Sequence, residues 1–198
     1  MSVCLVLPLK SLRDGKTRLA AVLDAGQRAA LIEELLMHSL DQAAQFPGLR
    51  NTVLVSPCEK ARARAGELGV RVVDERAPGL NQALQRAQRA VYQSGADIML
   101  MVPCDLPLLT AKDLRCLVDS AGTRAVALAP DRFKQGTNGL CLPTSAAFEF
   151  AFGPNSYERH RSSVERLHLH AVEVDRPGLA FDVDTPSDLA QLRSPHGR

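Results

Sequence analysis

The sequence has few aromatic side chains and no apolar run long enough to cross a membrane. Phe, Tyr and Trp make up 4% of the 198 residues, and tryptophan is absent. This scarcity argues against a surface on which nucleic-acid bases stack, and the net charge of +2 lacks the basic excess of a nucleic-acid-binding domain. A membrane span needs about 20 consecutive apolar residues. We therefore expect neither a nucleic-acid nor a membrane partner.

Sequence patterns for several kinds of chemistry are missing as well. The five cysteines are an odd number without a C-x-x-C pair, and the N-terminal apolar run, which no basic segment precedes, breaks at Pro8 and Lys10. These features favour free thiols in a reducing cytoplasm and argue against a secretion signal. The P-loop pattern G-x-x-x-x-G-K-[ST], the dinucleotide loop G-x-G-x-x-G and the nucleophile turn G-x-S-x-G are absent.

Apolar strands and amphipathic helices alternate along the chain. The strand predicted at Val3–Leu7 precedes a long helix predicted at Ala25–Gln45, and the alternation continues almost to the C-terminus. This pattern predicts an α/β fold with three layers, in which the central sheet is doubly wound and mostly parallel. It also predicts a helix over residues 144–151. The length suits a single domain over residues 1–193, followed by a disordered tail at 194–198.

Two carboxylates end an apolar run near the C-terminus. Residues 179–184 read Leu-Ala-Phe-Asp-Val-Asp, and alternate residues of a strand face the same side, so Asp182 and Asp184 should point the same way. Asp105 follows the apolar run 98–102, at a position where open α/β sheets bind ligands. Three converging carboxylates suit Mg²⁺. The alternative is that Asp105 is a turn residue and that the other two are a helix cap and a solvated charge.

A basic loop follows the first predicted strand. Lys10, Lys16 and Arg18 flank Gly15, where the first strand-to-helix turn of a nucleotide-binding fold holds phosphates. Their charges could neutralise a triphosphate and the leaving pyrophosphate. A basic surface loop is also compatible with simple solvation, but the three nearby carboxylates favour a phosphate site.

Two glycine-containing loops are candidates for holding a second anion. Residues 136–138, Gly-Thr-Asn, offer backbone donors, a hydroxyl and an amide, although an ordinary hairpin turn has the same composition. Residues 152–156, Phe-Gly-Pro-Asn-Ser, open a predicted helix, whose N-terminus either attracts anions or is only capped. His160 follows that loop and could contact an anion. His168 and His170 lack a third partner at metal-ligand spacing.

In their order along the chain, these motifs resemble the guanylyltransferases of coenzyme F420 biosynthesis, which activate 2-phospholactate, phosphoenolpyruvate or 3-phosphoglycerate with GTP. The resemblance covers nearly the whole chain, and the ordered set is specific although each motif alone is weak. This sequence departs from the family pattern at two positions: at Cys104 the family frequently has Ala, and at Asn155 it frequently has Gly. The matching segments are residues 8–10, 16–19, 80–84, 103–107, 130–132, 136–138, 152–156 and 182–186.

The resemblance implies a Rossmann-like fold related to the nucleotide-diphospho-sugar transferases. It also implies that an acceptor phosphate attacks GTP and that pyrophosphate leaves, with Mg²⁺ as the cofactor. The residues expected to hold Mg²⁺ are Asp105, Asp182 and Asp184. The residues expected to bind the substrates are Asn81, Thr137, Asn138, Gly153 and Ser156. The cations expected to assist catalysis are Lys10, Lys16 and Arg18.

Three other functions compete with this one. A sugar-phosphate or molybdenum-cofactor nucleotidyltransferase would carry a glycine-rich loop after the first strand, where this chain has Leu7-Pro8-Leu9-Lys10. A non-catalytic nucleotide-binding protein is expected to lack the acids, and all three are present. A metal-dependent phosphohydrolase would release its product without an acceptor. The sequence does not identify the preferred acceptor or the groups that recognise guanine. It also leaves the oligomeric state open, with a homodimer among the options.

Overall fold

A seven-stranded sheet runs through the part of the chain that the computed structural model describes, which is residues 1–9, 16–74, 79–122 and 124–194. Its strands are β1 (Val3–Pro8), β2 (Thr52–Ser56), β3 (Arg71–Asp74), β4 (Ile98–Met101), β5 (Ala125–Pro130), β6 (Thr137–Pro143) and β7 (His170–Glu173). Their order across the sheet is β3-β2-β1-β4-β6-β5-β7. Among these strands β6 alone runs antiparallel to its neighbours, because it returns from β5 in a hairpin. The expected mostly parallel α/β sheet is confirmed.

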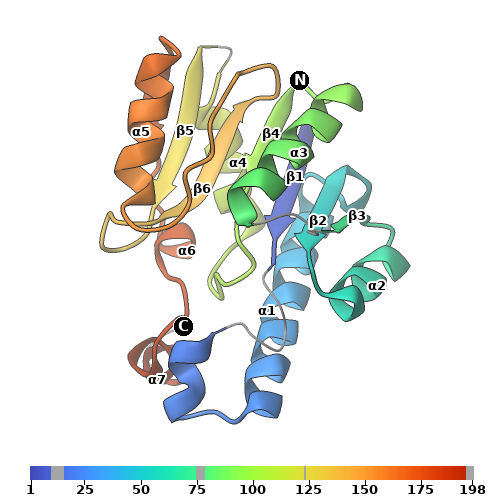
Figure 1. Cartoon of the computed structure of the whole chain (residues 1–198), viewed down its shortest axis with the longest axis vertical. Coiled ribbons are helices and arrows are strands. Elements are labelled where there is room, and N and C mark those ends of the chain that lie inside the picture. The colour runs from blue at the N-terminus through green and yellow to red at the C-terminus, as the bar shows by residue number, and fades with distance from the viewer. Residues whose placement is uncertain (10–15, 75–78, 123, 195–198) are drawn as a thin grey trace.

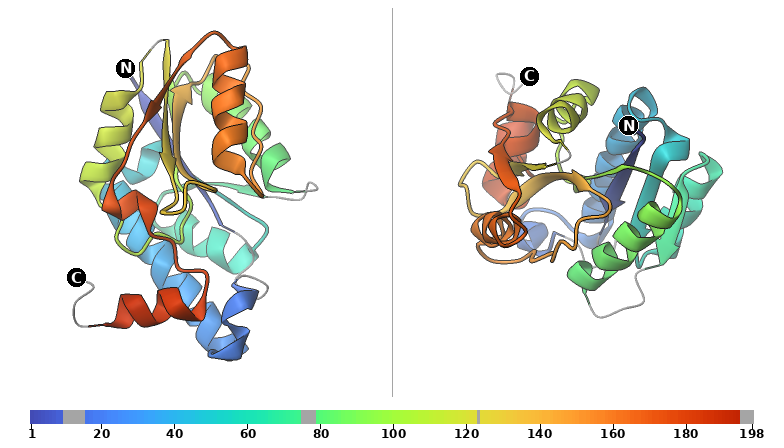
Figure 2. Two further views of the ribbon diagram at one scale, coloured as in Figure 1. Left: turned by 90° about the vertical axis from the view of Figure 1, so that its left-hand side faces the viewer. Right: turned by 90° about the horizontal axis from the view of Figure 1, so that it is seen from above.

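Helices cover both faces of this sheet (Figure 1; Figure 2). They are η1 (Thr17–Ala21), α1 (Ala25–Gln45), η2 (Leu49–Asn51), α2 (Glu59–Glu67), α3 (Leu80–Gln93), α4 (Ala111–Ser120), α5 (Ser156–Arg166), α6 (Pro177–Ala180) and α7 (Pro186–Arg193). Side chains from α1, α2 and α4 join one apolar core, and side chains from α3 and α5 join another. The two cores are the layers on either side of the sheet.

Alternating burial along each central strand produces this layered arrangement. On β1, Leu5 and Leu7 enter the first core, whereas Cys4 and Val6 enter the second. All four side chains are almost completely buried, which is why the strand reads as a continuous apolar run.

A third, smaller apolar cluster lies apart from the two sheet cores, and we call it the basal cluster. It joins η1 to the first half of α1, to the extended residues 181–183 and to α7, which lie together in the lower part of Figure 1. Because this cluster includes segments from both ends of the chain, it brings the residues that follow β1 close to those that precede α7. Its buried members are Leu19, Leu23, Leu31, Leu35, Phe181, Val183 and Leu189.

The helix predicted over residues 144–151 is wrong. Those residues form turns and irregular structure, and Thr144, the first of them, donates its hydroxyl to the Ala96 carbonyl at 2.7 Å. Phe148 and Phe150 are both buried in the second core, and their i, i+2 spacing fits extended backbone rather than a helix.

The strand predicted over residues 179–184 is also wrong. The chain forms the short helix α6, with Pro177 in its first turn, where proline is well tolerated. The following residues 181–184 are outside the sheet, and the Val183 N–H donates to the Asp105 carbonyl at 3.2 Å. The expected tail at 194–198 lies outside the described residues except for Ser194. None of the described helices has the length and apolar character that a membrane crossing requires.

Gly178 provides a test of how tightly α6 packs. A Cβ there would lie 2.6 Å from the Leu108 carbonyl oxygen and closer still to the Asp113 carboxylate, so Gly178→Ala should lower stability by about 1–3 kcal/mol and Tm by roughly 2–10 °C. Gly66→Ala in α2 is the matched control, because a Cβ there meets no atom within 4 Å and alanine favours helix. Equal melting temperatures for Gly178→Ala and wild type, measured by circular dichroism, would contradict this packing.

Candidate active site

The candidate site lies at the carboxyl ends of two neighbouring strands. β1 and β4 pair in parallel, with Val6 opposite Met101, so the segments that leave them emerge at the same edge. Lys16 lies on the segment after β1, and Asp105 lies on the segment after β4. Between adjacent strands whose connections diverge, open α/β sheets leave a crevice in which ligands bind.

Alternating burial sets the direction of the other two acids. Phe181 and Val183 are buried in the basal cluster, while Asp182 and Asp184 between and after them are only partly buried. The extended backbone therefore turns both carboxylates away from the cluster, as the sequence predicted, although the segment is not a strand of the sheet. The Val183–Asp105 backbone hydrogen bond fastens this segment to the end of β4.

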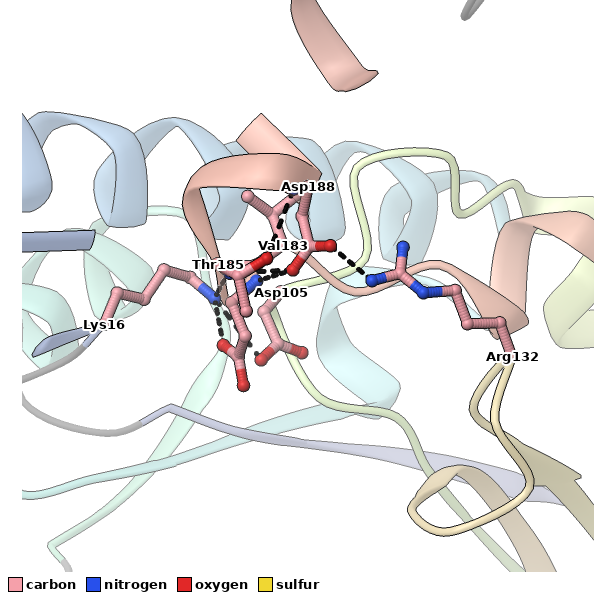
Figure 3. A network of polar contacts seen from close by, with 7 residues as sticks. Lys16, Asp105, Arg132, Val183, Thr185 and Asp188 are labelled. Carbon is pink, nitrogen blue, oxygen red and sulfur yellow. Dashed lines mark hydrogen bonds and ion pairs between the residues drawn. The ribbon is translucent and has the colours of Figure 1, made fainter. Parts of the chain in front are cut away.

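The Lys16 ammonium lies between the two acidic segments. Its Nζ is 3.1 Å from Asp184 Oδ1 and 3.5 Å from Asp105 Oδ2, and it donates to the Val183 carbonyl at 2.6 Å (Figure 3). The side chain is only 7% exposed. Burial opposes its charge, but the attraction of Asp105 and Asp184 outweighs that effect and raises the pKa of Lys16. Lys16 itself has left-handed backbone angles, φ 54° and ψ 41°, which non-glycine residues adopt mainly where surrounding contacts require them.

The acids carry more negative charge than Lys16 balances. Burial and then the neighbouring charges of Asp105 and Asp184 raise the pKa of Asp182 to about 6. In the described part of the chain, no three His, Cys, Asp or Glu side chains lie together as a ready-made metal site. Carboxylate oxygens are nevertheless the donors that Mg²⁺ prefers, so the chemistry of these three residues fits that ion. In this structure Asp105 and Asp184 contact the Lys16 ammonium.

An ion pair that the sequence pattern did not reveal supports the Asp184 backbone. Asp188 accepts hydrogen bonds from the backbone N–H groups of Asp184 and Thr185, at 2.9 and 2.7 Å, and forms an ion pair with Arg132 (Figure 3). Burial would raise the pKa of Asp188, but the Arg132 and backbone hydrogen bonds outweigh it and lower that pKa. Arg132 is 56 residues away in sequence, so spacing alone could not reveal this partner.

The second group of predicted residues lies at the same edge of the sheet. Because β6 runs antiparallel, its first residue, Thr137, lies where the parallel strands end. Nearby, the Tyr157 N–H at the start of α5 donates to the Gln135 carbonyl at 3.2 Å. Thr137 and Ser156 are 5% and 2% exposed, and the Thr137 hydroxyl pairs with His160 Nδ1 at 2.9 Å.

The two predicted asparagines support neighbouring backbone. The Asn81 side chain accepts from the Phe152 N–H at 2.7 Å and donates to the Phe152 carbonyl at 3.2 Å. Asn138 is buried and donates to the Leu179 carbonyl at 2.9 Å. Asn81 therefore fixes the backbone beside Gly153, and Asn138 links β6 to the segment that leads to the acids.

Asn155 occupies a left-handed position in front of α5. Its backbone angles are φ 55° and ψ 34°, a conformation that glycine adopts freely and asparagine tolerates better than most residues. Asparagine and the family's frequent glycine are thus both compatible with this backbone conformation. Gly153 also has positive φ, 124°. Of the expected catalytic cations, Arg18 lies exposed on η1, and Lys10 is outside the described residues.

Comparisons with known proteins agree over almost the full length. The family model described as "Guanylyl transferase CofC like" matches residues 3–197. The phosphoenolpyruvate guanylyltransferase of Rubrobacter xylanophilus is 38% identical over 198 residues, covering 100% of this chain and 96% of the relative. The protein of the same name from Sphaerobacter thermophilus is 36% identical over 192 residues, covering 97% of this chain and 93% of the relative.

Solved structures of nucleotide-using transferases share the fold. A structure from Desulfovibrio desulfuricans, described as a nucleotide-diphospho-sugar transferase, has a TM-score of 0.75 at 16% identity and covers 97% of this chain and 86% of its own. Glucosyl-3-phosphoglycerate synthase from Mycobacterium tuberculosis, in complex with Mg²⁺ and uridine diphosphate, has a TM-score of 0.64 at 16% identity and covers 99% of this chain and 76% of its own. At these identities the likeness establishes the fold, and it confirms the expected architecture.

The raised pKa of Asp182 gives a pH-dependent stability prediction for the metal-free protein. A carboxyl whose pKa is about 6 in the folded state and near 4 in the unfolded state destabilises the fold increasingly as the pH rises from 4 to 6. In EDTA, Asp182→Asn should therefore melt about 2–4 °C above wild type at pH 8, the shift that about 1 kcal/mol produces, and the difference should vanish near pH 4. A constant difference across this range would contradict the assigned pKa.

Lys16 should become more important for stability when divalent metal is withheld. Lys16→Met leaves Asp105 and Asp184 without their ammonium partner, and we expect a loss of about 1–2 kcal/mol after allowance for solvent screening, or roughly 2–8 °C in Tm. Added Mg²⁺ should restore more stability to this variant than it adds to wild type. Lys134→Met, which breaks the exposed pair with Glu173, is the control and should leave the response to Mg²⁺ unchanged.

Proposed function

The chain belongs to the Guanylyl transferase CofC like family, and we propose that it transfers GMP from GTP to phosphoenolpyruvate, releasing pyrophosphate, in the biosynthesis of coenzyme F420. The observation that carries this proposal is the family match over residues 3–197. Relatives at 36–38% identity that are named for phosphoenolpyruvate support this acceptor over 2-phospholactate and 3-phosphoglycerate. The five free cysteines fit a cytoplasmic location.

The reaction requires the positioning of two anions rather than a protein nucleophile. A phosphate oxygen of the acceptor attacks the α-phosphorus of GTP and forms a new P–O bond, while the bond from that phosphorus to the bridging oxygen breaks and the electron pair leaves with pyrophosphate. The attacking oxygen is already anionic, so no strong general base is needed. Charge neutralisation and alignment are then the main contributions of the protein.

The acidic end of the site is assigned to the metal and the nucleotide. Asp105, Asp182 and Asp184 would hold Mg²⁺, which, when bound, supplies positive charge to the reacting phosphates. Lys16 already lies among these acids at 3.1 and 3.5 Å, and its ammonium is thereby held at the edge where the triphosphate is proposed to lie. Arg18, exposed on η1, is proposed to contact the same phosphates.

The β6–α5 side of the site is assigned to the acceptor. Thr137, Gly153 and Ser156 would bind its phosphate and carboxylate through hydroxyl and backbone donors. The Arg132 N–H donates to the Ala180 carbonyl at 2.9 Å, and Asn138 bonds Leu179, so the hairpin that carries Thr137 is fastened to the segment that carries the acids. This connection supports a common site for both substrates.

Acceptor-dependent release of pyrophosphate tests the proposal directly. With GTP and Mg²⁺, wild type should release pyrophosphate in the presence of phosphoenolpyruvate, more slowly with the other two acceptors, and hardly at all without an acceptor. Asp184→Asn should lower kcat/KM by about a hundredfold to a thousandfold, the usual effect of removing an electrostatic group at a reacting centre. Glu67→Gln, which alters an exposed acid 65% accessible on α2, should not change the rate. Pyrophosphate or phosphate release that is independent of every acceptor would indicate hydrolysis instead.

A further inference from the structure

His160 has no exposed surface and contacts Thr137, one of the proposed acceptor-binding residues. It comes from the second turn of α5, and its ring packs against Phe152, with the centroids 4.6 Å apart in an edge-to-face arrangement, and against Phe148 at 5.6 Å. Both of its ring nitrogens have partners. Nε2 is 2.9 Å from the backbone nitrogen of Ala151, and Nδ1 is 2.9 Å from the Thr137 hydroxyl oxygen.

The backbone partner determines which nitrogen of His160 carries the proton. A backbone N–H can only donate, so the Ala151 N–H must meet the lone pair of Nε2. A neutral imidazole has one N–H, which must then be on Nδ1. Burial, and then the nearby Arg159, lower the pKa of His160 to about 4, so the ring is neutral at physiological pH. Nδ1–H therefore donates to the Thr137 hydroxyl oxygen.

This direction of donation constrains the Thr137 hydroxyl. Its oxygen accepts from His160, so its own proton is available to a different acceptor atom. We propose that His160 is a positioning residue which, as the Nδ1–H tautomer, makes the Thr137 hydroxyl a hydrogen-bond donor aimed at an anionic oxygen of the acceptor substrate. This inference rests on the proposed function, in which Thr137 contacts the acceptor.

The same histidine joins the two walls of the acceptor side. Thr137 begins β6, whereas Ala151 immediately precedes Phe152 and Gly153 of the loop before α5. The backbone of Phe152 is held in turn by the Asn81 amide. His160 thus fixes the Thr137 hydroxyl relative to the Gly153 loop, and its protonation on Nε2 would place two donors against each other at Ala151.

Nitrogen NMR of the wild-type protein tests the tautomer without any substrate. In a ¹H–¹⁵N correlation spectrum at pH 7 of protein labelled on its histidine rings, the His160 signals, identified by their loss in His160→Phe, should show a protonated Nδ1 and an unprotonated Nε2. A protonated Nε2, or a ring that titrates with a pKa near that of a free histidine, would overturn the proposal.

Steady-state kinetics test the consequence for the acceptor. His160→Phe and Thr137→Val should each raise KM for phosphoenolpyruvate about tenfold or more, the effect of one lost hydrogen bond to a charged group, with KM for GTP within about twofold of wild type. Thr137→Ser keeps the hydroxyl and should stay close to wild type. Because both impaired variants remove the same His160–Thr137 hydrogen bond, the double variant should be less impaired than the product of the two single effects predicts.

Matched controls separate positioning from general stability. His38→Phe removes a histidine that contacts the Leu109 carbonyl at 2.9 Å, away from the acceptor side, and it should leave KM for phosphoenolpyruvate unchanged. Additive effects in the double variant, or equal rises in KM for GTP and acceptor, would overturn the positioning role. Absence of GMP transfer to all three acceptors by wild type would overturn the proposed function instead, and the ring signals would still decide the tautomer.

Discussion

Mutual repulsion among three carboxylates is the constraint around which this edge of the sheet is organised. Asp105 and Asp184 lie close enough to Asp182 to raise its pKa, and they are held there because apolar residues beside them are buried, not because the carboxylates attract one another. Val183 enters the basal cluster with no exposed surface, and its backbone bonds the segment that leaves β4. Hydrophobic burial thus holds together charges that would otherwise separate, and the Lys16 ammonium offsets part of the repulsion at 3.1 and 3.5 Å.

Two buried acids of this chain are paired differently from the three proposed metal ligands. Asp188 and Asp113 are buried, and each has its own arginine, Arg132 and Arg176 respectively. Within the described residues, the ion pairs of the three candidate metal ligands involve one lysine, Lys16, which contacts two of the three. A fully paired buried acid fixes a fold, as Asp188 fixes the Asp184 backbone, whereas a deficit of positive charge leaves a place for a cation or a phosphate-bearing ligand with its own metal.

The sequence predicted the sheet and most helices because their burial is periodic. The range of α1 agrees with the sequence expectation residue for residue. Errors arose where the burial pattern does not distinguish one secondary structure from another. Residues 144–151 bury two aromatic side chains from irregular backbone, and residues 179–184 include the end of the short helix α6 before an extended segment. The Arg132–Asp188 pair and the contacts of His160 were missed because they join residues that no local pattern relates, and only the fold brings those partners together.

Several polar side chains that resemble ligands in the sequence are used to hold backbone in place. Asn81 forms hydrogen bonds with the backbone of Phe152. Asn138 does so with the backbone of Leu179, and His160 with that of Ala151. These bonds fix the proposed acceptor side before any substrate arrives, which would lower the entropy that binding must overcome. The proposed nucleotide side is organised differently, since Lys16 is held there by the charges of Asp105 and Asp184, which incoming phosphates and a metal would change. A hydrogen-bonded acceptor side and a nucleotide side held by charge, as proposed, suit a reaction in which two anions must be brought into line.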